Sequence, residues 1–191
     1  QVALMLGADS PDVSFVISLA GVGVDGLQIL KLQNDAILRT TPGMTPERVD
    51  QFMSLFNTLF DKVHSVPLEQ PLDIPLRQAF DQWVAQQDEA TLKAVNFNDG
   101  RDEMFFSRYL HQAQGRWYRE MINYDPENYI PRIRKPVLAL NGDKDIMVPA
   151  KENLESIKQL LDKGGNTQYK IEELPGLNHM FQRCKECTRE E

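Results

Sequence analysis

The feature that most constrains the fold is a strand–helix–strand pattern in the last third of the chain. Residues 136–140 (P-V-L-A-L) form a short apolar segment, and residues 168–174 form a second strand-like segment that ends at a Pro-Gly turn. Between them, apolar residues repeat at helical spacing until Gly164 and Gly165. A strand, a helix and a strand with short connections predict a βαβ unit, in which the two strands are parallel and the crossover is right-handed.

A third strand is predicted much earlier in the chain. Residues 13–19 (V-S-F-V-I-S-L) are rich in β-branched residues and nearly apolar on both faces. This composition is typical of a central parallel strand that is covered by helices on both sides. Residues 1–7 are apolar throughout and indicate part of a buried helix.

The long segment between these strands has a helical pattern. Thr45 is a suitable N-cap for a helix, and apolar residues follow it at helical spacing; further helices are predicted over 76–84 and 101–121. We therefore predict an α/β fold with two parts. Residues 1–21 and 131–191 form a core with a partial parallel sheet, and residues 22–130 form a helical cap insertion.

Composition excludes several classes of partner. The 191 residues include 21 basic and 28 acidic ones, giving a formal charge of −7 without any basic cluster. Nucleic-acid binding and a polybasic membrane surface are therefore disfavoured, and no apolar run reaches the roughly 20 residues of a membrane span. The spacing of Cys184 and Cys187 is interpreted as incidental, because a lone C-x-x-C supplies only two of the four ligands that zinc needs.

Both ends of the sequence are abrupt. Residues 1–7 begin inside an apolar pattern without a cap, and residues 184–191 form a charged segment with no terminal element. We expect the chain to be a piece of a longer protein. A three-stranded sheet would also expose one strand edge, so we expect either a homo-oligomer along that edge or a longer polypeptide that covers it.

Two polar clusters follow two of the predicted strands directly. Asp145 lies in the cluster 141–149, and His179 lies in the cluster 175–181. Because ligands of parallel α/β sheets bind beyond the carboxyl ends of the strands, these two loops are expected to be neighbours at a site. A carboxylate beside a histidine accepts the imidazole Nδ1–H and stabilises the imidazolium that forms when Nε2 takes a proton from a nucleophile.

These segments resemble the α/β-hydrolase family. Residues 142–149 (G-D-K-D-I-M-V-P) and 174–181 (L-P-G-L-N-H-M-F) are similar to its acid and histidine loops, in the family's order of acid before histidine. Residues 117–136 resemble the return from the lid in its acyl-hydrolase branches. Residues 1–21 resemble the helix, turn and strand that follow the nucleophile elbow, so the resemblance covers nearly the whole chain.

The resemblance implies a catalytic role for Asp145 as the triad acid and for His179 as the general base, with Asp143 as the competing acid. It implies hydrolysis of an ester or similar acyl bond in a small molecule, with no cofactor or metal. No G-x-S-x-G motif is present, so the nucleophilic serine is expected upstream of Gln1. The 191-residue chain alone is then expected to be inactive, because it would lack the nucleophile and the oxyanion donors.

Two other functions compete with this hypothesis. One is a non-catalytic binding protein that has kept the same fold. The other is a metal-dependent phosphotransfer enzyme that uses Asp143 and Asp145, since hard cations prefer carboxylate ligands. The remaining histidines, His64 and His111, lie in predicted helices of the cap and are expected to face solvent or to pack there.

Overall fold

A computed structural model describes residues 1–188 of the chain. It has a mixed α/β fold with a small parallel sheet and many helices, which confirms the predicted fold class. The chain divides into two compact units. One, the sheet unit, contains residues 1–41 and the chain from residue 125 onward; the other, the helical unit, contains residues 42–124.

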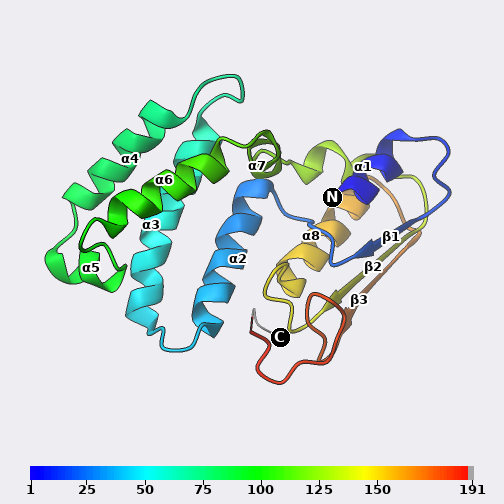
Figure 1. Cartoon of the computed structure of the whole chain (residues 1–191). Coiled ribbons are helices and arrows are strands. Elements are labelled where there is room, and N and C mark those ends of the chain that lie inside the picture. Colours follow the sequence, from blue (N-terminus) through cyan, green and yellow to red (C-terminus); the bar gives the residue numbers. More distant parts are fainter. Residues whose placement is uncertain (189–191) are drawn as a thin grey trace. The chain divides into compact units, whose positions relative to one another are not determined.

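The sheet unit is built on three parallel strands (Figure 1). The strands β1 (Val16–Leu19), β2 (Val137–Gly142) and β3 (Tyr169–Leu174) lie in the order β1-β2-β3. The helix α8 (Ala150–Lys163) connects β2 to β3, so the predicted βαβ unit is present. Its amphipathic pattern explains the packing, because the apolar side of α8 is buried against the sheet.

One face of the sheet holds the core of this unit. The helices α1 (Val2–Asp9) and α8 pack against it, and Leu4, Val16 and Ile157 belong to one buried cluster. The chain returns to β2 through two short 3₁₀ turns at Pro126–Asn128 and Ile130–Arg132.

The other face of β1 is open within residues 1–188. Because successive strand residues point to opposite faces, Phe15, Ile17 and Leu19 share this face, and their exposed fractions are 61%, 49% and 58%. Phe15 and Ile17 border a groove of about 550 Å³ that also includes Leu138 and Lys170. The prediction that residues 13–19 form a central strand covered on both sides is therefore wrong for the described residues, where β1 is an edge strand.

The helix α2 (Gly26–Thr40) belongs to the sheet unit. Asp25 caps its N-terminus by accepting a hydrogen bond from the backbone N–H of Gln28 at 2.8 Å. Ile29 then packs in a small buried cluster with Val148. The compact helical unit is consequently narrower than the predicted insertion 22–130, because these contacts join α2 to the loop after β2.

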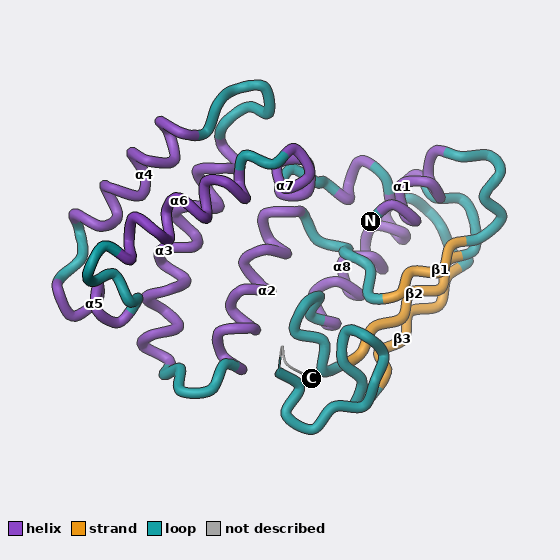
Figure 2. Tube along the Cα trace, in the orientation of Figure 1, coloured by secondary structure: helices purple, strands orange, loops and turns teal. Residues whose placement is uncertain are grey.

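The helical unit consists of helices joined by loops, as Figure 2 shows. Aromatic side chains form part of its core. Phe80 contacts the rings of Phe97, Phe105 and Phe106 at centroid distances of 5.0–6.2 Å. The helices are α3 (Pro46–Ser65), α4 (Asp73–Ala85), α5 (Glu89–Ala94), α6 (Arg101–Ala113) and α7 (Arg116–Ile122).

Three local predictions differ from the structure. The helix expected at 76–84 begins at Asp73, because Pro75 is tolerated in a first turn, where its missing N–H needs no partner. The helix expected over 101–121 is interrupted at Gly115, where α6 has ended and α7 has not begun. Cys184 and Cys187 form a disulfide, so their spacing is not incidental.

Across residues 1–188, no helix is both long enough and apolar enough to span a bilayer.

Candidate active site

Two loops meet at the carboxyl ends of β2 and β3. We call residues 143–149 the acid loop and residues 175–183 the histidine loop. Gly142, the last residue of β2, allows their close approach, because a Cβ there would lie 2.0 Å from the carbonyl oxygen of Leu177. The same carbonyl accepts a hydrogen bond from the backbone N–H of Lys144 at 3.1 Å. The backbone itself therefore holds the two loops together.

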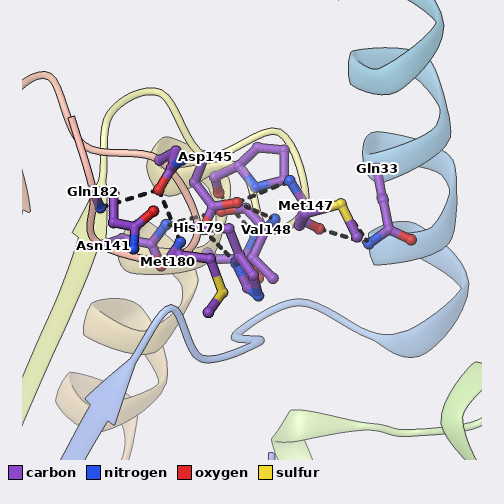
Figure 3. A network of polar contacts seen from close by, with 11 residues as sticks. Gln33, Asn141, Asp145, Met147, Val148, His179, Met180 and Gln182 are labelled. Atoms are coloured by element: carbon purple, nitrogen blue, oxygen red, sulfur yellow. Dashed lines mark hydrogen bonds and ion pairs between the residues drawn. The ribbon is translucent and has the colours of Figure 1, made fainter. Parts of the chain in front are cut away.

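Asp145 is the centre of the polar network at this junction (Figure 3). Its side chain has no exposed surface, and its Oδ1 accepts hydrogen bonds from the backbone N–H groups of Met147 and Val148, both at 2.8 Å. Its Oδ2 accepts from the Nδ2 of Asn141 at 3.1 Å and lies 2.9 Å from the Nδ1 of His179. Four N–H groups thus surround one buried carboxylate, which compensates its loss of solvation.

His179 is held in place by a turn of the histidine loop. The Oδ1 of Asn178 accepts hydrogen bonds from the backbone N–H groups of Met180 at 3.0 Å and Gln182 at 3.1 Å. Phe181, with φ of 59°, donates its backbone N–H to the carbonyl of Asn178 at 2.9 Å. An asparagine side chain that mimics a backbone turn in this way fixes the direction of the neighbouring residue.

The Asp145–His179 hydrogen bond affects the proton affinity of the imidazole. The hydrogen bond to Asp145 raises the pKa of His179, partial burial opposes that rise, and the charge of the carboxylate adds to it. The imidazole is 39% exposed, whereas the carboxylate is fully buried. Within residues 1–188 the Nε2 atom makes no hydrogen bond, so a neutral imidazole that donates Nδ1–H to Asp145 presents a free lone pair at Nε2.

Asp143 has a different set of contacts. Its Oδ1 accepts the backbone N–H of Gly176 at 2.6 Å, and its Oδ2 lies 3.7 Å from the Nζ of Lys144. The structure thus brings His179 to Asp145 and uses Asp143 to connect the two loops. Among the described residues, no group of three or more histidines, cysteines, aspartates or glutamates could hold a metal ion.

None of the serines within residues 1–188 hydrogen-bonds to His179. Ser156 donates its hydroxyl to the carbonyl of Gly23 at 2.7 Å, and Ser18 is buried on β1. The other two histidines, His64 and His111, are exposed in the helical unit, as expected for side chains on its surface.

Sequence reasoning did not single out two residues of this network. Asn141 belongs to the first polar cluster, but no role was predicted for it. Gln33 lies in the segment 22–130, for which only a helical pattern was predicted. Gln33 donates from Nε2 to the carbonyl of Met147 at 3.1 Å and so connects α2 to the acid loop (Figure 3). An amide residue directly after an apolar strand was a usable signal for Asn141, whereas Gln33 has no local pattern that could have revealed its contact.

Comparison with known proteins finds weak structural similarity. No protein-family model matches the chain, and neither does any curated protein. A solved structure described as the crystal structure of esterase E22 is similar to 93% of this chain, with 15% sequence identity and a TM-score of 0.40. The chain spans 53% of the length of that structure. This level of similarity does not assign the chain to a family.

Proposed function

We propose that Asp145 and His179 are the acid and the general base of a serine hydrolase that cleaves a carboxylic ester or a related acyl bond. One observation supports this most directly. A fully buried carboxylate lies 2.9 Å from the Nδ1 of a partly exposed imidazole, and the two side chains come from loops that follow adjacent parallel strands. Sites of parallel α/β sheets are found at this edge.

In the proposed mechanism each side chain has one task. Asp145 accepts the Nδ1–H of His179 and so keeps the lone pair on Nε2. Nε2 takes the proton of a serine hydroxyl as its oxygen attacks the acyl carbonyl, and Asp145 stabilises the resulting imidazolium. The imidazolium then gives its proton to the leaving alcohol. In this proposal the serine comes from a nucleophile elbow upstream of Gln1.

We also propose that the helical unit acts as the cap of the site and selects the substrate. Topology supports this role. The chain enters α2 and then the helical unit after β1, and it returns to the sheet at β2, the strand that leads into the acid loop. Because β1 and β2 are parallel, β1 ends at the same edge of the sheet as the strand that precedes the acid loop, so the segment that leads to the helical unit starts at the edge where the site would lie.

The decisive experiment uses the upstream coding sequence and the longer protein that it specifies. We expect a serine four positions before Gln1 and hydrolysis of short-chain p-nitrophenyl esters. In that protein His179→Ala and Asp145→Asn each lower kcat/KM by about 10³-fold or more. The matched controls His111→Ala and Asp143→Asn, which leave the Asp145–His179 contact intact, retain activity within about threefold.

One result would overturn this proposal, and a second would change where its nucleophile lies. A glycine or alanine at the fourth position before Gln1 would favour a non-catalytic binding protein, which is the alternative consistent with the lack of any serine bonded to His179 among the described residues. Ester hydrolysis by the 191-residue chain itself, if abolished by His179→Ala, would show that the nucleophile lies within this sequence instead.

A further inference from the structure

Asn141 is a buried amide whose two ends have unequal surroundings. It is the next-to-last residue of β2, and its exposed fraction is 0%. Its Nδ2 donates to the Oδ2 of Asp145 at 3.1 Å and to the carbonyl of Val148 at 2.9 Å. Its Oδ1 is buried and has no hydrogen-bond partner among the described residues.

The orientation of this amide is determined by its two partners. Both the Oδ2 of Asp145 and the carbonyl oxygen of Val148 accept hydrogen bonds and cannot donate them when the carboxylate is ionised. A flipped amide would place its oxygen against both acceptors, so the donating orientation is the favourable one. The amide thus gains two hydrogen bonds from its Nδ2 but leaves its Oδ1 buried without a partner, which costs free energy. An apolar side chain at this position would fill the space without that cost, so packing alone does not explain an asparagine here.

The two oxygens of Asp145 are held by different parts of the chain. Oδ1 is held by backbone N–H groups of the acid loop, those of Met147 and Val148. Oδ2 receives one hydrogen bond from Asn141 and one from His179. With Oδ1 fixed, the carboxylate can still rotate and move Oδ2 away from the imidazole, and Asn141 restrains that rotation from the rigid strand β2.

We infer that Asn141 is a positioning residue, which holds the Oδ2 of Asp145 against the Nδ1 of His179. Its second hydrogen bond, to the carbonyl of Val148, fixes the far end of the acid loop to the same strand. The catalytic meaning of this role rests on the proposed function. The positioning itself determines which ring nitrogen of His179 carries the proton in the neutral state, because Oδ2 beside Nδ1 favours a proton on Nδ1.

The test measures the tautomer of His179 by ¹⁵N NMR in the 191-residue chain labelled at its three histidines. The neutral imidazole of the unaltered protein should carry its proton on Nδ1, because Nδ1–H donates to Asp145. His64 and His111 are exposed and supply reference signals. In Asn141→Ala we expect the Nδ1–H fraction of His179 to fall to less than half of its original value.

Two further variants separate positioning from a loss of stability. Asn141→Leu keeps most of the buried volume but removes the donor, and should give the same change in tautomer as Asn141→Ala. Asn166→Ala is the matched control, because Asn166 is also buried in the sheet unit and donates to the carbonyls of Ile133 at 3.0 Å and Lys135 at 2.9 Å. It should lower stability and leave the His179 signals unchanged.

The outcomes distinguish this inference from the proposed function. A folded Asn141→Ala or Asn141→Leu protein with the original tautomer would overturn the positioning role alone. Failure of both variants to fold, with a folded Asn166→Ala control, would show that Asn141 is needed for the loop as a whole and would also overturn it. An unaltered protein with its His179 proton on Nε2 would contradict the Asp145–His179 pair itself.

Discussion

In each unit of the molecule a deeply buried charged side chain holds a loop in place. In the sheet unit Asp145 accepts hydrogen bonds from the acid loop. In the helical unit Arg119, with 4% exposure, donates to the carbonyls of Val66, Pro67 and Gln70 at 2.5–2.9 Å. Both groups compensate their burial with hydrogen bonds to the chain, and this requirement explains why each loop folds closely around its charge.

The two charges differ in what else they contact. The described partners of Arg119 are backbone carbonyls, which do not titrate, and a guanidinium does not give up its proton in proteins. Asp145 has in addition a partner, His179, whose titratable imidazole is partly exposed. Burial with several hydrogen bonds to the backbone therefore does not by itself indicate chemistry. The candidate site differs from the Arg119 cluster because it contains a second titratable group that solvent can reach.

The largest expected effect is the loss of the buried carboxylate. Asp145→Ala leaves the N–H groups of Met147, Val148 and Asn141 without their acceptor. We expect the sheet unit to lose about 3–4 kcal/mol of unfolding free energy, measured by urea denaturation, because unpaired buried donors cost about 1–3 kcal/mol each. The control Asp143→Ala removes one described hydrogen bond, from Gly176, and should cost about 1 kcal/mol. Equal losses in the two variants would remove the distinction between them.

The corresponding change in the helical unit is Arg119→Met. This substitution keeps much of the side-chain volume but deprives three carbonyls of their donor, so we expect a loss of about 2–3 kcal/mol in unfolding free energy. The NMR signals of His179 should remain unchanged. Arg116→Met is the matched control, since the Arg116 side chain is 87% exposed and its ion pair with Glu120 contributes little. A shift of the His179 signals in Arg119→Met would show that the surroundings of Arg119 and Asp145 are coupled, which would contradict this prediction.

A smaller effect is expected at the open edge of the sheet. Residues 13–19 carry no charge, and an antiparallel pairing of two copies centred on Ile17 would place Phe15 opposite Leu19. Ile17→Lys would put like charges opposite each other, so we expect self-association, followed by sedimentation velocity, to weaken about tenfold or more. Ile74→Lys is the control, because Ile74 is 64% exposed on the helical unit. An unaltered protein that stays monomeric at high concentration would contradict pairing along β1.

The sequence predicted the parts of the fold that depend on local patterns. The apolar segments before the two polar clusters and the amphipathic helix between them were sufficient to predict parallel strands and adjacent loops. The contact between Asp145 and His179 agrees with that prediction, whereas their catalytic role stays a prediction. The edge position of β1 could not be predicted, because an apolar strand has the same composition whether or not a neighbour covers it.

The contacts that support the site were harder to predict, because they join residues far apart in the sequence. Gln33 and Met147 are 114 residues apart, and no periodicity relates them. Arg119 lies in the segment 101–121 that was predicted to be helical, and the carbonyls to which it donates lie about 50 residues earlier. Local spacing indicates which face of a helix is apolar, but it does not indicate which distant polar atoms that face will meet.

The smallest expected effect is the pH dependence of the Asp145–His179 pair. Because the hydrogen bond to Asp145 raises the pKa of His179 in the folded protein, folding favours the imidazolium. The resulting stabilisation is fully present below the ordinary histidine pKa near 6.5 and is lost as the pH rises through the folded-state pKa. The difference in unfolding free energy between the unaltered protein and His179→Gln should therefore be largest at about pH 5.5 and shrink toward about pH 8.5. Partial exposure of the imidazole keeps this effect small.

The control His111→Gln, on the helical unit, should retain the pH profile of the unaltered protein. A difference for His179→Gln that grows with pH would contradict the direction of the shift.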